Sequence, residues 1–214
     1  MDELPEEIVN EILIRVHQSG RLFASNVCVM WYKLLMKTVK IIVTDDDFRR
    51  ACRRGDLLSI VKSKFNKGLI NSGLRGACTG GHVDIVELMI SKGANDWNVG
   101  LWGACRGNHL NLVELMISKG ANNWNNGFWG ACRGGHVDIV KLMIAKGANN
   151  WNDGLWGACI EGRTTLVELM IAKGADDLNH GLSSACYGGH VDIVELMIDK
   201  GATRCNCGKS IIEH

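Results

Sequence analysis

The sequence predicts an all-α solenoid built from short helix-turn-helix units. The first observation is a row of cysteines that recur every 27 residues without a slip in register: Cys78, Cys105, Cys132, Cys159 and Cys186. The second observation is that the residues around these cysteines recur with the same period. A fixed period of about 20–50 residues is typical of solenoids, in which each unit buries its apolar face on its neighbours. We count six units over residues 45–205.

The charge balance and the apolar pattern argue against several classes of partner. The 214 residues include 24 Lys and Arg against 23 Asp and Glu, and a net charge of +1 gives no field that would attract nucleic acid or an anionic membrane. No apolar run reaches the roughly 18 residues of a membrane helix, and the acidic N-terminus does not resemble a signal peptide. We therefore expect an intracellular, cytoplasmic protein whose nine cysteines are reduced. The 26 glycines beside a single proline indicate frequent, regularly placed turns.

Each unit is expected to form two short helices, and the fourth unit shows the pattern clearly. Residues 128–134 are predicted to form its first helix, followed by a turn at Gly134 and Gly135. Residues 136–146 are predicted to form the second helix, and Gly147 is predicted to end it in a left-handed conformation. Apolar residues of this second helix return at intervals of three and four: Val137, Val140, Met143 and Ile144.

The recurring text resembles a known repeat family. The pattern A-C-x-G-G-H-V-D-I-V-E-L-M-I-x-K-G-A-N is similar to the ankyrin repeat, whose usual text there is A-A-x-x-G-H-x-x-I-V-x-L-L-L-x-x-G-A-D. The resemblance implies a protein-binding solenoid. Ankyrin units usually have about 33 residues, and the missing residues fall where the family projects its β-hairpin fingers, so we expect the fingers to be stunted or missing. The Thr-Pro-Leu-His opening of the first helix is also replaced, and Trp129 stands at the position of its His.

Residues 1–40 lie outside the repeats and leave two interpretations open. Two amphipathic stretches predict helices, which could simply cap the apolar face of the first unit. The segments LPEEIVNEIL (4–13) and VCVMWYKLL (27–35) also resemble the F-box, which in that family docks the Skp-type adaptor of a cullin–RING ubiquitin ligase. The residues that match are Leu4, Pro5, Ile8, Ile12, Val27, Cys28, Trp31 and Leu34. Gly20, Arg21 and Asn26 depart from the family pattern.

The resemblance to both families implies a substrate adaptor. An F-box followed by ankyrin units resembles proteins of large DNA viruses that redirect host protein degradation, which would place the chain in the host cell. In that interpretation the F-box binds the ligase and the repeats bind a target protein. The alternative is a stand-alone ankyrin scaffold that sequesters a host protein, with residues 1–40 only a cap. Residues 206–214 are assigned to a C-terminal tail.

Two sets of side chains on the first helices are candidates for binding the target. Trp102, Trp129 and Trp156 occupy the family's His position, toward the concave surface. Tryptophan is enriched in binding hot spots, but duplication would copy a packing residue equally well, so both roles stay open. The second set follows the recurring cysteines, varies between otherwise similar copies and is expected to be exposed: Thr79, Arg106, Arg133, Ile160 and Tyr187.

The other prominent residues favour structural roles. Neighbouring units pack about 8–10 Å apart, beyond the roughly 7 Å Cα limit for a disulfide, so the recurring cysteines are expected to be buried thiols. The histidines that open the second helices are also expected to have structural roles: His82, His109, His136 and His190. The loop tryptophans are expected to fill the gaps between units: Trp97, Trp124 and Trp151.

Catalytic, metal and anion sites receive little support from the sequence. No set of acid, base and nucleophile stands clear of the repeat pattern, so we expect neither an enzyme nor a cofactor. Cys205, Cys207 and His214 lack a second pair of ligands, so we expect no metal. The basic run Arg49–Arg54 follows three aspartates, which favours a solvated helix face over an anion site.

Overall fold

The computed structural model describes residues 44–56 and 67–205, and all regular elements within these ranges are helices. The chain divides into two units, Met1–Val43 and Thr44–His214, and only the second contains described residues. The F-box-like segment and the tail with Cys207 and His214 therefore lie outside the described residues. No described helix has both the length and the apolarity needed to cross a bilayer.

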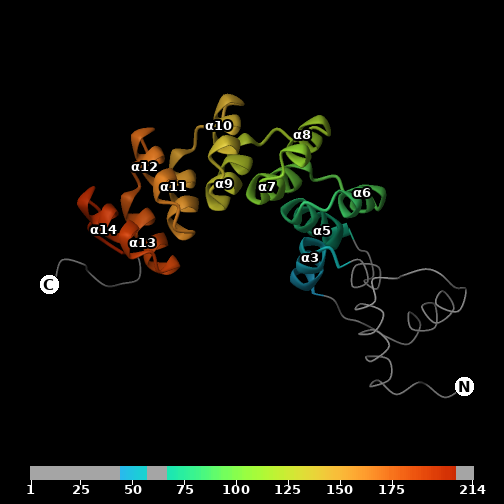
Figure 1. Cartoon of the computed structure of the whole chain (residues 1–214), viewed down its shortest axis with the longest axis horizontal. Coiled ribbons are helices and arrows are strands. Elements are labelled where there is room, and N and C mark those ends of the chain that lie inside the picture. Colours follow the sequence, from blue (N-terminus) through green and yellow to red (C-terminus); the bar gives the residue numbers. More distant parts are fainter. Residues whose placement is uncertain (1–43, 57–66, 206–214) are drawn as a thin grey trace, which may run out of the picture. The chain divides into compact units, whose positions relative to one another are not determined.

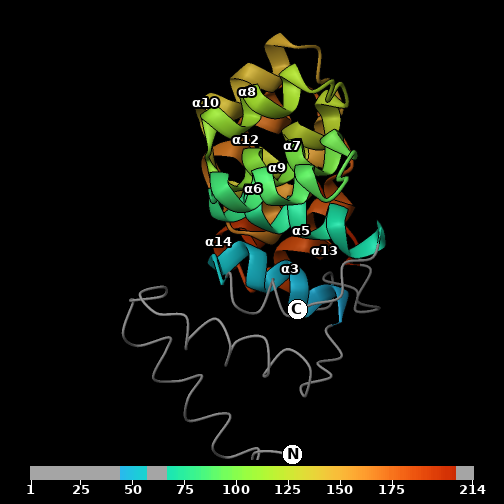
Figure 2. The ribbon, with the colours of Figure 1, turned by 90° about the vertical axis from the view of Figure 1, so that its right-hand side faces the viewer.

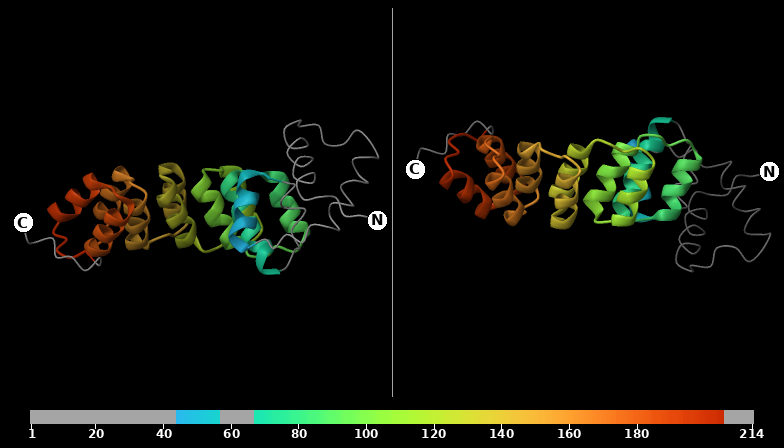
Figure 3. Two further views of the ribbon diagram at one scale, coloured as in Figure 1. Left: turned by 90° about the horizontal axis from the view of Figure 1, so that it is seen from below. Right: turned by 90° about the horizontal axis from the view of Figure 1, so that it is seen from above.

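The helices form two rows that confirm the predicted helix-turn-helix solenoid (Figure 1). The first helices of the successive repeats are α3 (Asp45–Arg54), α5 (Lys67–Gly80), α7 (Trp97–Gly107), α9 (Trp124–Gly134), α11 (Trp151–Ile160) and α13 (Leu178–Gly188). The second helices are α6 (Val83–Ser91), α8 (Leu110–Ser118), α10 (Val137–Ala145), α12 (Thr164–Ala172) and α14 (Val191–Asp199). Figure 2 looks along the stack and shows the two rows side by side, and Figure 3 shows the repeats following one another in chain order. The first helices line the inner side of the arc in Figure 1.

The first helices begin earlier than the sequence predicted. Helix α9 starts at Trp124 rather than at residue 128, because the side chain of Asn123 accepts a hydrogen bond from the backbone amide of Asn126 and caps the helix. Its C-terminal end is as predicted, since Gly135 adopts a left-handed conformation with φ of 84°. Gly147, with φ of 110°, likewise stops the second helix as expected.

The connection between units is too short for a finger. Only residues 148–150 separate Gly147 from α11, and this confirms that the β-hairpin of longer ankyrin units is missing here. An asparagine in each first helix from α5 to α13 makes the connection instead. The side-chain oxygen of Asn98 accepts hydrogen bonds from the backbone amides of Asn122 and Asn123, at 3.0 and 2.9 Å. The same pair of bonds recurs at Asn71, Asn125, Asn152 and Asn179.

The glycine content has a second cause besides the turns that the sequence indicated. Ten glycines do adopt positive φ at turns and helix ends. Others lie within the first helices, where neighbouring backbones approach closely. A Cβ atom at Gly103 would lie 2.5 Å from the carbonyl oxygen of Arg75, and one at Gly130 would lie 2.6 Å from that of Trp102. Any side chain there would force the two helices apart.

The core repeats from unit to unit and contains the cysteines as predicted. Leu101, Val113 and Met116 are buried in one unit, and their equivalents between α5 and α14 are also buried, apart from the half-buried Val194. Burial raises the pKa of Cys105 to about 12, so its thiol stays protonated and acts as a small apolar group. Cys78, Cys132 and Cys159 are buried in the same way. Cys186 is an exception, because it is exposed on the last first helix of the described solenoid.

Candidate functional site

The inner side of the arc carries one equivalent side chain from each first helix. We call Arg75, Trp102, Trp129 and Trp156 the inner row, because they occupy the same position in α5, α7, α9 and α11. The position is occupied by arginine in α5 and by tryptophan in the next three helices. Close packing of the first helices therefore places four large side chains next to one another along this face.

The members of the inner row stack on one another. The guanidinium carbon of Arg75 lies 3.8 Å from the centre of a Trp102 ring. The ring centres of Trp102 and Trp129 are 5.6 Å apart, and those of Trp129 and Trp156 are 5.0 Å apart and nearly parallel, with an interplanar angle of 13°. His180 of α13 continues the stack at 5.6 Å from Trp156. The result is an unbroken series of cation–π and ring contacts through five units.

The three tryptophans differ in what they leave accessible. Trp102 is only 4% exposed, so packing is its observed role. Trp129 and Trp156 are half-buried and therefore retain some exposed area. The indole nitrogens of Trp102 and Trp129 are buried without a hydrogen-bond acceptor among the described residues. Target binding by the inner row remains a prediction, now concentrated on Trp129 and Trp156.

The variable residues after the cysteines are less exposed than the sequence suggested. Only Tyr187, at 86% exposure, is an open surface side chain, and Thr79 and Ile160 are half-buried. Arg106 and Arg133 are held by Glu161, which accepts hydrogen bonds from them at 3.1 and 2.6 Å. The expectation of an exposed row is therefore wrong for four of the five residues, because the first helices converge and their C-terminal ends pack together.

Glu161 was missed by the sequence analysis, although a signal was present. The fifth unit has Glu161 where the fourth has Gly134, in an otherwise closely similar segment. Its carboxylate joins Arg106, two units away, and Arg133, one unit away. All three side chains are about a quarter exposed, at 24%, 21% and 28% for Arg106, Arg133 and Glu161. One acidic residue thus fixes two basic residues on the inner side.

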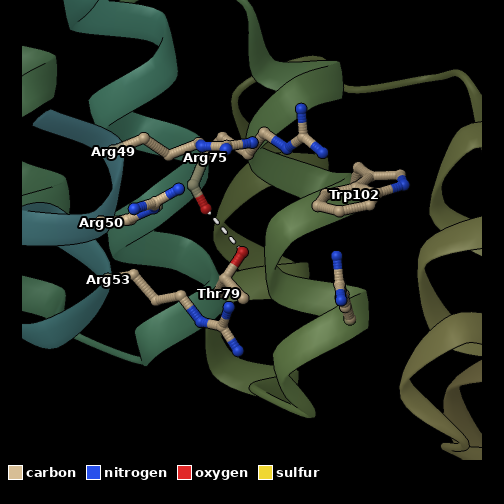
Figure 4. Close-up of a pocket in the computed structure, with 8 residues that line it drawn as sticks. Arg49, Arg50, Arg53, Arg75, Thr79 and Trp102 are labelled. Carbon is tan, nitrogen blue, oxygen red and sulfur yellow. Dashed lines mark hydrogen bonds between the residues drawn. The ribbon is translucent and has the colours of Figure 1, made fainter. Parts of the chain in front are cut away.

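The basic run of the first unit is largely exposed, as predicted, but part of it also lines a pocket. Arg50, Arg53 and Arg54 are exposed and Arg49 is half-buried. Arg49, Arg50 and Arg53 form one wall of the pocket. The opposite wall comes from α5 and α7. Figure 4 shows the three arginines extending from α3 toward Arg75 and Thr79, with Trp102 on the far side. The hydroxyl of Thr79 donates to the carbonyl oxygen of Arg75 at 2.8 Å.

The recurring histidines make structural contacts between units, as expected. A ring nitrogen of His82 lies 3.0 Å from the carbonyl oxygen of Arg53, and one of His136 lies 3.1 Å from that of Arg106. Each therefore connects the start of a second helix to the preceding unit. Burial is the main cause that lowers the pKa of His136, which favours the neutral ring in this position.

The tryptophans that were expected in loops instead begin first helices. Trp97, Trp124 and Trp151 are the first residues of α7, α9 and α11, and all are half-buried. Trp151 makes an edge-on contact with Phe128 of the preceding unit, at 5.8 Å between ring centres. This contact agrees with the predicted role of filling the space between units.

One set of predicted site residues is not placed by this geometry. The eight F-box residues, from Leu4 to Leu34, lie outside the described ranges. Within those ranges, no three His, Cys, Asp or Glu side chains are grouped as a metal site would require.

The comparison with protein-family models agrees with the architecture. Residues 101–179 match the family model for ankyrin repeats, in three copies. No curated protein matches the chain. Among solved structures, the human ASB11 ankyrin repeat domain is similar, with 25% identity, a TM-score of 0.46, and coverage of 76% of this chain and 88% of that one. Residues 101–179 therefore consist of ankyrin repeats, a fold that serves as a scaffold for binding other proteins.

Proposed function

We propose that the chain is a substrate adaptor: residues 1–40 bind the Skp-type adaptor of a cullin ubiquitin ligase, and the solenoid binds a target protein. The ligase half is supported by the resemblance of residues 4–13 and 27–35 to the F-box. The target half is supported by the ankyrin repeats over residues 101–179.

The observation that carries target binding is the stacked inner row. Because Trp129 contacts the ring of Trp156 on one side and that of Trp102 on the other, its position is fixed before any partner arrives. A fixed side chain loses little conformational entropy on binding, which favours affinity. Trp129 and Trp156 also retain exposed area, and large aromatic side chains of this kind dominate binding energy at protein interfaces.

A binding assay with the purified full-length chain and a Skp-type adaptor tests the ligase half. We expect a stoichiometric complex at micromolar concentrations, and we expect the double substitution Leu4→Ala with Pro5→Ala to abolish it. The matched control is the exposed pair Asp138→Ala with Lys141→Ala on α10, which should bind as the unmodified chain does. Circular dichroism of both variants shows whether the helices are retained.

The outcome separates the adaptor from a stand-alone scaffold. If the unmodified chain does not bind the Skp-type adaptor, residues 1–40 are only a cap and the chain is a scaffold that sequesters its target. If the Leu4 and Pro5 variant binds as well as the unmodified chain, the F-box assignment fails in the same way. Target proteins are identified independently, by mass spectrometry of what co-purifies with the chain.

A further inference from the structure

An arginine-lined pocket on the inner side has no role in the proposed function. It is a cavity of about 140 Å³ between three first helices. Its lining comprises Arg49, Arg50 and Arg53 of α3, Arg75, Gly76 and Thr79 of α5, and Trp102 and Arg106 of α7. Side chains from separate units thus converge on one space, as Figure 4 shows for the labelled residues. We call this feature the arginine pocket.

The positive charge of the arginine pocket is only partly neutralised. Asp46 forms ion pairs with Arg49 and Arg50, and Glu161 is shared between Arg106 and Arg133. Among the described residues, neither Arg53 nor Arg75 has a carboxylate within ion-pair distance. Five guanidinium groups in the lining are therefore opposed by two directly paired carboxylates, one of which also serves a sixth arginine.

Arg75 lies among the positively charged side chains of this pocket. Its guanidinium carbon lies 3.8 Å from the centre of a Trp102 ring, and no described carboxylate forms an ion pair with it. The pKa of Arg75 is lowered, first by partial burial and then by the neighbouring charges of Arg49, Arg106 and Arg133. Asp45 opposes this effect in part, but its carboxylate also accepts a hydrogen bond from Ser72. A bound anion would relieve the remaining repulsion.

Volume and charge define the ligand. Whole drug-sized or nucleotide-sized ligands need pockets of about 300 Å³ or more, so a cavity of about 140 Å³ suits a single anionic group. A phosphate monoester carries about −1.5 to −2 charges and three strong acceptor oxygens, which matches converging guanidinium forks better than one carboxylate does. Gly76 lets α5 approach α3 closely, because a Cβ atom there would clash with the carbonyl oxygen of Arg49.

We propose that the arginine pocket binds a phosphate monoester, presented by a phosphorylated side chain of a protein partner. A nucleic-acid backbone fits less well, because it needs a continuous basic stripe. Beyond Arg75 the inner row continues with tryptophans, and Arg133 is held by Glu161. The choice of a protein as the carrier rests on the proposed target binding, whereas binding of the phosphate group itself does not.

Calorimetric titration of the full-length chain tests the pocket in two stages. The first probe is inorganic phosphate, for which we expect a dissociation constant of about 1 mM or tighter at low ionic strength. The second is a glycine-flanked phosphoserine peptide, which should bind at least as tightly as phosphate, while its unphosphorylated form should not bind. Arg53→Gln and Arg75→Gln should each weaken phosphate binding about 10- to 100-fold, the range for loss of a hydrogen bond to a charged group.

Arg54→Gln is the matched control, because it removes the same charge one residue away from Arg53 but outside the pocket lining. It should leave phosphate affinity unchanged, and circular dichroism should show that all three variants are folded. Equal effects of Arg53→Gln and Arg54→Gln would overturn the proposal, since they would indicate nonspecific charge attraction. Undetectable phosphate binding, or tighter binding of oligothymidine than of the phosphoserine peptide, would also overturn it. Binding of phosphate but not of the phosphoserine peptide would reject a protein as the carrier. Because none of these titrations uses the Skp-type adaptor or the target, their result is independent of the ligase assay.

Discussion

The first helices pack differently in the two halves of the described solenoid, which we define as α3–α8 and α9–α14. Between α5 and α7 the contact is backbone to backbone, because Gly103 faces the carbonyl oxygen of Arg75. Between α9 and α11 the equivalent Gly157 faces the ring of Trp129, which a Cβ atom would approach to 2.9 Å. In the first half α5 and α7 therefore pack through main-chain contacts, whereas in the second half α9 and α11 pack through the side chain of Trp129.

The two halves also differ in their charge. In the first half the inner row begins with Arg75, and the neighbouring arginines remain only partly paired. In the second half Trp129 and Trp156 fill the inner row, and Glu161 pairs with Arg133 of the same half and with Arg106 of α7. A basic pocket thus lies at one end of the arc, and an aromatic face follows along the rest. This division can be tested by substitutions in each half.

The largest effect is expected from Trp129→Ala in the second half. Loss of a core aromatic side chain costs about 3–5 kcal/mol, and because Trp129 is half-buried we expect a loss of about 3 kcal/mol in the free energy of unfolding, measured by urea denaturation. Target binding should also weaken, by about 2 kcal/mol or more if the ring is a hot spot. Trp129→Phe, which preserves an aromatic ring in the stack, should recover most of the stability. Unchanged stability of the alanine variant would show that the stack contributes little to closing this half.

A smaller effect is expected from Gly103→Ala in the first half. Helix propensity alone would favour alanine by about 1 kcal/mol, but the new Cβ atom would lie 2.5 Å from the backbone of α5, which cannot rotate away. Overpacking of this kind costs about 1–3 kcal/mol, so we expect a net loss of about 2 kcal/mol in the free energy of unfolding. Gly157→Ala should cost less, because the ring of Trp129 can shift. Equal losses for the two variants would remove the distinction between the halves.

The sequence predicted the solenoid, its units and the buried cysteines, because these depend on patterns within one unit. The resemblance to the longer ankyrin unit predicted stunted or missing fingers, because the residues that would form them are absent from each unit. The sequence placed the helix starts too late, because the cap that Asn123 forms depends on a side-chain hydrogen bond and not on the apolar pattern. Helices α7, α9 and α11 therefore begin at tryptophans that had been assigned to loops.

The features that the sequence could not predict depend on contacts between units. Glu161 reaches Arg106 across 55 residues, and the arginine pocket combines α3, α5 and α7. Neither contact has a periodic signal, because each arises from a departure from the repeat. The exposure of Arg106 and Arg133 was overestimated for this reason, since the closeness of the first helices at their C-terminal ends follows from the glycines between them.

A third prediction concerns Glu161, which pairs with one arginine in each half. Glu161→Gln keeps the shape of the side chain but removes the charge shared by Arg106 and Arg133. Since all three groups are partly exposed, the expected loss in the free energy of unfolding is about 1 kcal/mol, the upper part of the range for such pairs. Because Arg106 also lines the arginine pocket, freeing it should strengthen phosphate binding. Weaker phosphate binding in this variant would mean that Glu161 holds Arg106 in place for the ligand.

The smallest effect on stability is expected from ionisation of the buried cysteines. Chemical labelling of these cysteines also tests how readily each half opens. Burial raises the pKa values of Cys78, Cys105, Cys132 and Cys159 to about 12, against an ordinary value of 9.0, so the folded state favours the protonated thiols. The stability that this contributes is complete below pH 9.0 and is lost as the pH rises from 9.0 toward about 12.

At neutral pH a thiol reagent can reach these four cysteines only through opening of the fold, because the thiolate is the reactive form and the groups are buried. Cys186 is exposed and should be labelled first. Mass spectrometry of timed labelling reactions then reports opening at each cysteine. In Trp129→Ala we expect Cys132 and Cys159, on the helices that flank the lost contact, to become labelled faster than Cys78, whereas in Gly103→Ala the order should be reversed. If both variants accelerate all four cysteines equally, the solenoid opens as one cooperative unit and the two halves differ only on their surface.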